Sequence, residues 1–286
     1  MSQPYVFQKT IQRSGTLTGI GLHTGLSCSL TFRSAQTDTG IRFYLNGDSA
    51  PAVLSVPEGP VLTGSLRCSR IGVGSKQLLT VEHLLASFRG LGLTNLIVEA
   101  DGPEVPGMDG SALPFMKFLK GLGIEEQARS VEFYRITEPI FCYDNLRSIC
   151  VYPAEELSVS YTLDYPHPYL KDQTVDFILT PDVFESQIAP SRTFCTDKEA
   201  QELTKRGFGL GATQENTVVV YEDGSHRSAL RFPDECARHK VLDILGDLQL
   251  AGFPILGRII GLRSGHALNQ NLVRAIIQQK NMGVTV

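Results

Sequence analysis

The segment 235–250, ECARHKVLDILGDLQL, predicts a long amphipathic helix. Its apolar residues recur at intervals of three or four, which places them on one face of a helix. This face comprises Ala237, Val241, Ile244, Leu248 and Ala251. Gly252 ends the pattern, and we expect a strand over 255–262 and a helix over about 268–279 to follow it. A helix, a strand and a helix in this order indicate a mixed α+β fold.

The first half of the chain predicts elements in a similar order. Extended runs at 29–32 and 40–44 precede a helix that we expect to begin at Thr80, a favourable N-cap, and to end near Gly92. The remaining expected elements are a strand over 95–99, a helix over 111–119, and strands over 132–135, 148–152 and 158–163. Two halves of similar order predict structural duplication, although no sequence repeat is visible.

The expected fold class is therefore α+β, with two similar domains that each pack a sheet against two helices. The domains are predicted to span residues 1–128 and 129–286. Two stretches, about 56–74 and about 195–223, do not fit this plan. Each is predicted to be an insert, one per domain, of the kind that decorates a functional site.

Composition excludes several classes of protein. Hydrophobic residues make up 42% and charged residues 20% of the 286 residues, as in ordinary globular proteins, and the net charge of −4 argues against a nucleic-acid-binding protein. The six cysteines are scattered without a C-x-x-C pair, which indicates reduced thiols. No apolar run approaches the ~20 residues of a membrane span, and the N-terminus lacks the pattern of a signal peptide. We therefore expect a cytoplasmic protein with no integral membrane segment.

Polar residues on the long helix have the spacing of a metal site. His239 and Asp243 are four residues apart, so they lie one above the other on a helix, and Asp247 lies one turn further along. An imidazole and a carboxylate one turn apart can both point at one cation. The alternative is an exposed helix that carries an ordinary His–Asp pair.

Two further histidines stand in suggestive surroundings. Glu82 and His83 are adjacent at a predicted helix start, so one can bind an ion while the other approaches a water molecule on it. His266 lies between Gly265 and a predicted helix, where it would suit a general acid or an oxyanion partner. Each also has a structural interpretation. Glu82 and His83 could simply be polar residues at a helix start, and His266 could be a capping or packing residue. Together they favour a single catalytic zinc held by two histidines and one carboxylate, with a position left open for water.

At these residues the chain resembles the UDP-3-O-acyl-N-acetylglucosamine deacetylase family. Three stretches carry the resemblance at the expected metal site: TVEHLL at 80–85, HKxxD at 239–243 and SGHALN at 264–269. Four more motifs follow the family order over nearly the whole chain, namely GIGLHTG at 19–25, EVPGMDGS at 104–111, LDYPHP at 163–168 and RTF at 192–194. The resemblance implies zinc-dependent removal of an acetyl group in the committed step of lipid A synthesis. It also implies two α+β domains with the active site between them.

The resemblance implies roles for individual residues at the reacting centre. His83, His239 and Asp243 would hold one catalytic zinc, with ferrous iron as the other candidate for the native metal. Glu82 would be the general base, and His266 the general acid or the stabiliser of the tetrahedral anion, supported by Asp247. Whether Glu82 works alone or shares the acid–base chemistry with His266 stays open here.

The resemblance also implies roles in substrate binding. Thr193 would donate to the oxyanion, Lys240 would contact the diphosphate, and Tyr165 would stack near uracil. Phe194 is expected to contact the substrate, and the insert after it would form an acyl passage lined by Leu203, Phe208 and Val219. Cys195, which stands where glycine is common, leaves the acyl-chain preference open.

Two alternatives to this deacetylase remain open. One is a zinc amidohydrolase that acts on a different amide, and the other is a binding protein that senses a nucleotide-sugar lipid without catalysis. The complete set of metal ligands, with Glu82 and His266, favours an enzyme. The expected partner is the nucleotide-sugar lipid substrate, the protein is expected to be a monomer, and no second catalytic unit is expected after Val286.

Overall fold

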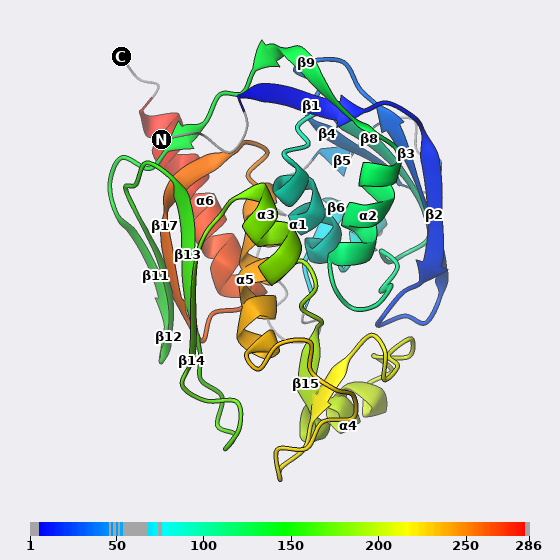
Figure 1. Ribbon diagram of the computed structural model, residues 1–286, viewed down its shortest axis with the longest axis vertical. Helices are drawn as coiled ribbons and strands as arrows, with labels where there is room; N and C mark the ends of the chain where they lie inside the picture. Colours follow the sequence, from blue (N-terminus) through cyan, green and yellow to red (C-terminus); the bar gives the residue numbers. More distant parts are fainter. Residues whose placement is uncertain are drawn as a thin grey trace.

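Two β-sheets enclose two layers of helices in the computed structural model (Figure 1). The structure describes residues 6–45, 47, 50, 52–53, 68–73 and 76–283. Buried apolar residues from both halves form one continuous core. This arrangement confirms the α+β fold class. Within the described residues, no helix combines the length and the apolar character needed to cross a membrane.

The first sheet belongs to the N-terminal half and has five strands. Their order is β2 (Gly15–Ile20), β3 (Ser27–Ser34), β8 (Leu96–Asp101), β4 (Ile41–Leu45) and β5 (Ala52–Val53). Buried and more exposed residues alternate along β3 and β4, so that one face of the sheet is apolar. Two helices, α1 (Glu82–Leu91) and α2 (Leu113–Gly121), cover this face, and Phe32 of β3 contacts the rings of Phe88 and Phe118 on them.

The second sheet belongs to the C-terminal half and has the same general design. Its strands follow the order β11 (Ile140–Asp144), β12 (Arg147–Tyr152), β17 (Ile255–Leu262), β13 (Leu157–Leu163) and β14 (Gln173–Ile178), with β10 (Tyr134–Arg135) beside β17. Helices α5 (Glu235–Gln249) and α6 (His266–Met282) lie on its inner side (Figure 1).

The two halves meet where α1 packs against α5. Gly246 of α5 allows this close approach, since a Cβ atom there would lie 2.1 Å from the carbonyl oxygen of Glu82. The α1–α5 contact therefore places the start of α1 against the C-terminal part of α5.

Smaller elements complete the described chain. Strand β1 (Phe7–Ile11) pairs with β9 (Ile124–Ser130), and β6 (Arg70–Val73) pairs with β7 (Lys76–Leu79). A short helix α3 (Pro181–Val183) continues into the π-helical turn η1 (Phe184–Ile188). Strand β15 (Phe194–Thr196), helix α4 (Asp197–Lys205) and strand β16 (Val218–Val220) form a separate unit at the edge of the molecule (Figure 1). The boundary that we predict after residue 128 falls within β9, and the division into domains stays a prediction.

Several boundaries expected from the sequence are confirmed, and others are wrong. The strand 255–262 has the expected bounds, and α5 begins at the expected residue. Thr80 is not an N-cap: its φ of +58° is left-handed, its hydroxyl donates to Glu104, and α1 begins at Glu82. Of the strand expected over 132–135, only the last two residues are in a strand, and they pair with β17. Most of the expected insert 56–74 lies outside the described residues, which begin again at 68.

Candidate active site

His83, His239 and Asp243 converge where α1 meets α5. One ligand atom from each lies within 4.8 Å of the others, and all three side chains are buried. The Oδ1 atom of Asp243 lies 3.3 Å from Nε2 of His239 and 3.9 Å from Nε2 of His83. This oxygen is buried and has no hydrogen-bond partner among the described residues, which is costly unless a cation satisfies it. Two imidazole nitrogens and one carboxylate oxygen are the donor set of a catalytic zinc site.

The protonation states of this His–His–Asp cluster suit a cation. Burial lowers the pKa of His83 to about 3 and also lowers the pKa of His239, so both imidazoles are neutral at physiological pH. Burial alone would raise the pKa of Asp243, but Lys240 and the surrounding histidines outweigh it and hold that pKa below its usual range. Two neutral imidazoles and one carboxylate are therefore ready to coordinate a metal without first losing protons.

Hydrogen bonds from outside the cluster orient two of its members. Nδ1 of His239 lies 3.0 Å from the carbonyl oxygen of Ser191. Because a carbonyl only accepts, Nδ1 must carry the proton, which leaves the lone pair on Nε2 for a metal. The ammonium of Lys240 donates to Oδ2 of Asp243 at 2.6 Å and leaves Oδ1 free.

Glu82 immediately precedes His83 in the sequence, and its side chain lies beside the cluster. Its carboxylate is buried, and Oε2 accepts a hydrogen bond of 3.0 Å from the backbone nitrogen of Ser69. Burial raises the pKa of Glu82 to about 8; His266 opposes this shift, whereas Asp243 and Asp247 add to it. A carboxylate with a raised pKa binds a proton more readily, as a general base requires.

His266, the first residue of α6, faces Glu82. Its Nε2 lies 3.6 Å from Oε1 of Glu82, and its Nδ1 lies 2.9 Å from Oδ2 of Asp247. Burial lowers the pKa of His266, but Asp247, Asp243 and Glu82 outweigh it and raise that pKa to about 10. The imidazole is therefore held in its protonated form, which can donate a proton or stabilise an anion.

Two residues to which the sequence analysis gave no role support Asp247. The hydroxyl of Ser69 donates to Oδ1, and Asn269 donates to Oδ2 at 2.8 Å. Asn269 follows His266 by three residues on one helix, so helical spacing could have indicated it. No local pattern indicates Ser69, which reaches the site from the loop before β6.

The other residues expected at the site lie around this centre. The rings of Tyr165 and Phe194 are 5.8 Å apart, and the ring of Phe194 lies 6.3 Å from that of His239, so these aromatics extend outward from the cluster. Thr193 joins the two halves, because its backbone nitrogen donates to the carbonyl oxygen of Gly110. Its hydroxyl makes no contact with another described residue that defines a role.

The three expected lining residues of an acyl passage all belong to the 195–223 segment. The backbone nitrogen of Phe208 donates to the carbonyl oxygen of Leu203 at 2.9 Å, so these two residues are neighbours. Val219 lies on β16. The ring of Phe208 stands 6.2 Å from that of His23. The segment therefore reaches His23 in the loop 19–25, although it does not contribute to the His–His–Asp cluster.

A buried carboxylate holds the glycine-rich loop 19–25 next to the site. Glu104 accepts hydrogen bonds from the backbone nitrogens of His23 and Thr24 and from the hydroxyls of Thr24 and Thr80. Gly21 is required here, since a Cβ atom would lie 2.4 Å from Oε2 of Glu104. The loop is therefore a turn packed on a carboxylate, and it fixes the chain immediately before α1.

Comparisons with known proteins agree with the geometry. A family model described as UDP-3-O-acyl N-acetylglycosamine deacetylase matches residues 8–278. The chain is 38% identical over 278 residues to a UDP-3-O-acyl-N-acetylglucosamine deacetylase of Leptospira biflexa, with 97% of this chain and 92% of the relative covered. It is also 38% identical over 272 residues to the protein of the same name from Thermodesulfovibrio yellowstonii, with 95% and 92% covered. The protein of that name from Acidithiobacillus ferrooxidans is 38% identical over 279 residues, with 96% and 91% covered.

Proposed function

The chain belongs to the UDP-3-O-acyl-N-acetylglucosamine deacetylase family, and from that premise we propose that it hydrolyses the N-acetyl group of UDP-3-O-acyl-N-acetylglucosamine in lipid A biosynthesis. The products are acetate and the free amine of the sugar. The observation that carries the proposal is the buried Oδ1 of Asp243, which no described residue hydrogen-bonds and which lies beside two neutral imidazoles, Glu82 and His266. An acid and a base beside a cation site are what hydrolysis of an unreactive amide needs.

The cofactor is proposed to be one zinc ion held by His83, His239 and Asp243, with ferrous iron as the alternative. The nitrogen and oxygen donors fit either ion. When bound, the ion supplies Lewis-acid polarisation of the amide carbonyl and of the attacking water.

The two flanking residues divide the proton transfers. Glu82 takes a proton from the attacking water as its oxygen adds to the amide carbonyl carbon. His266, kept protonated by Asp247, lies next to Glu82 and stabilises the tetrahedral anion. When the C–N bond breaks, His266 gives its proton to the departing amine. The acetyl group, which has gained the oxygen of the attacking water, leaves as acetate.

The remaining expected residues are proposed to bind the substrate. Thr193 would donate to the oxyanion from the base of the 195–223 segment. Lys240 would contact the diphosphate, and Tyr165 with Phe194 would stack beside the nucleotide. Leu203, Phe208 and Val219 would line the path of the acyl chain. A cytoplasmic location and a monomeric state are proposed together with this activity.

Acetate release tests the proposal directly. Purified protein would be assayed with UDP-3-O-acyl-N-acetylglucosamine of several acyl lengths, before and after metal removal and after addition of one equivalent of zinc. We expect activity to disappear with chelation and to return with zinc. No acetate release by the zinc-loaded protein at any acyl length would favour a different amide substrate or a binding role.

A further inference from the structure

A fourth polar residue extends the series of active-site residues on α5. Glu235, His239, Asp243 and Asp247 are spaced four residues apart, so their side chains line one face of the helix. Glu235 is fully buried, yet it contributes nothing to the cluster or to the proton transfers. A buried carboxylate is retained only where charged and polar groups compensate for its lost hydration.

Glu235 binds both ends of one long segment of chain. Its Oε1 accepts from the backbone nitrogen of Arg192 at 3.0 Å and from Nε of Arg192 at 2.9 Å. Its Oε2 accepts from Nη2 of Arg192 at 3.2 Å and from the backbone nitrogen of Arg231 at 2.7 Å. Arg192 and Arg231 flank β15, α4 and β16, so one carboxylate closes the base of this 192–231 segment.

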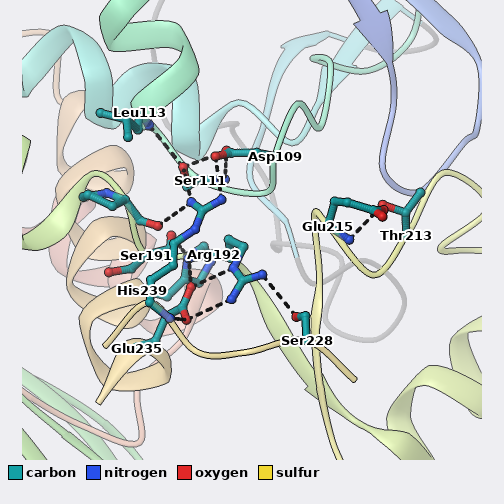
Figure 2. Close-up of polar contacts among 12 residues, drawn as sticks. Asp109, Ser111, Leu113, Ser191, Arg192, Thr213, Glu215, Ser228, Glu235 and His239 are labelled. Atoms are coloured by element: carbon teal, nitrogen blue, oxygen red, sulfur yellow. Dashed lines mark hydrogen bonds and ion pairs between the residues drawn. The ribbon is translucent and has the colours of Figure 1, made fainter. Parts of the chain in front are cut away.

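The same contacts set the position of a cluster member. Ser191 immediately precedes Arg192, and its carbonyl oxygen accepts from Nδ1 of His239 (Figure 2). Since Glu235 holds both the backbone and the guanidinium of Arg192, it fixes the peptide unit that carries this carbonyl. Glu235 thus acts on His239 through Arg192 and Ser191. It also acts through helix α5, which carries both Glu235 and His239.

The arginines extend this arrangement to the rest of the fold. Arg192 also donates to Ser228 and to the carbonyl oxygen of Ala229, which tightens the returning end of the segment (Figure 2). Arg231 donates to the carbonyl oxygen of Pro190 at 2.7 Å and pairs with Asp109 at 2.9 Å. The base of the segment is therefore bonded to both halves of the molecule.

We propose that Glu235 is a positioning residue that couples closure of the 192–231 segment to metal binding by His239. The inference rests on the proposed metal site and extends it to the segment that would receive the acyl chain. Because coupling between two sites is reciprocal, Glu235 should strengthen metal binding, and the bound metal should hold the segment closed.

Zinc affinity of the full-length protein tests the first half of this coupling. In Glu235→Gln, Arg192 loses its charged partner and the Ser191 carbonyl is released. We expect the Kd for zinc, measured in competition with a chelator of known affinity, to rise about 10–100-fold, as for other residues that orient a metal ligand.

Asp234→Asn is the matched control. Asp234 lies one residue earlier at the same helix start, is partly exposed and pairs with Arg238 rather than with Arg192 or Arg231. The substitution removes the same charge at nearly the same place and leaves the Glu235 contacts intact. We expect its zinc affinity to equal that of the parent protein. An equal loss in both variants, or in neither, would overturn the proposal.

Limited trypsin digestion tests the second half. Lys198, Lys205 and Arg206 are exposed on and just after α4 and report on opening of the segment. We expect zinc to slow cleavage at these sites in the parent protein and in Asp234→Asn, and to have little effect in Glu235→Gln. Zinc protection that is undiminished in Glu235→Gln would contradict the coupling.

A double variant covers the case in which Glu235→Gln fails to fold. Arg192→Met with Glu235→Gln removes both charges of the buried pair and so avoids a lone buried cation. We expect this protein to fold but to retain the weak zinc affinity, and parental affinity would overturn the proposal. Neither readout uses substrate, so an inactive parent protein that still shows Glu235-dependent zinc binding would refute the deacetylase function alone.

Discussion

The helix α5 and the β15–α4–β16 unit meet near His239, but they are built in opposite ways. All of α5 is buried except Arg238 and Lys240, whereas no residue of α4 is buried. The polar residues of α5 are held by partners from three other parts of the chain, namely Ser69, Ser191 and His266. Helix α4 is held at its start by a capping box between Thr196 and Glu199.

This difference separates two requirements of the enzyme. Acid–base and metal chemistry need atoms fixed to fractions of an ångström, which a buried helix held by several other parts of the chain provides. Recognition of a flexible acyl chain, which we propose for the β15–α4–β16 unit, tolerates an exposed unit that is anchored at its base. Substitutions on the helix pair should therefore abolish chemistry, and substitutions on the unit should alter selectivity.

The largest effect is expected from removing the cluster carboxylate. Asp243→Ala deletes the oxygen that faces both imidazoles and leaves Lys240 without its partner. We expect the purified variant to contain no stoichiometric zinc and to show no acetate release, as measured by metal analysis and a product assay. Retention of one tightly bound zinc would place the metal elsewhere.

The next largest effect is expected at Glu82. Glu82→Gln keeps the size of the side chain and its hydrogen bond to Ser69 but cannot take a proton. We expect kcat to fall about 10²–10⁴-fold, the range for loss of a general base, with zinc content unchanged. A fall below tenfold would assign the proton transfer to another group.

The pH dependence should separate the acid from the base. The raised pKa of His266, about 10, means that its protonated form persists through neutral pH and is lost as the pH rises toward that value. We expect the parent enzyme to lose kcat/KM on the basic side, and His266→Ala to show a lower kcat/KM that no longer has this basic limb. An unchanged basic limb in His266→Ala would exclude it as the acid.

Packing of the helix pair should matter for stability. Gly246→Ala would bring a Cβ within 2.1 Å of the Glu82 carbonyl oxygen, so α1 and α5 must move apart. We expect a loss of about 1–3 kcal/mol in the free energy of unfolding, measured by urea titration. Gly121→Ala at the end of α2 is the control, since a Cβ there meets nothing within 4 Å, and it should be neutral.

The smallest effect is expected in the exposed unit. Phe208→Ala removes an aromatic ring near His23 without touching the cluster. We expect kcat/KM to fall by roughly 10-fold for long acyl chains and little for short ones, since each lost apolar contact costs about 1–3 kcal/mol of discrimination. Equal losses for all chain lengths would show that the unit takes part in the chemistry instead.

Local patterns in the sequence predicted much of the helix pair. The periodicity of 235–250 identified α5, and four-residue spacing placed His239, Asp243 and Asp247 on one face. The same spacing also places Glu235 on this face. Its positioning role was not predicted, because its partners Arg192 and Arg231 lie 43 and 4 residues away along the chain. Thr80 was misassigned because its hydroxyl bonds to Glu104 rather than to the helix start.

The sequence by itself determined the helix-borne residues, because helical periodicity is a local property that fixes which side chains share a face. It also determined the family, since the motifs keep their order along the chain. Only the tertiary structure excluded the alternative of an exposed His–Asp pair on α5, because α1 covers this helix. Burial there lowers the pKa of His83 and His239 and makes both imidazoles neutral. Only the tertiary structure, likewise, brought Ser69 and the Ser191 carbonyl to the site, because hydrogen bonds between distant segments depend on packing rather than on sequence spacing.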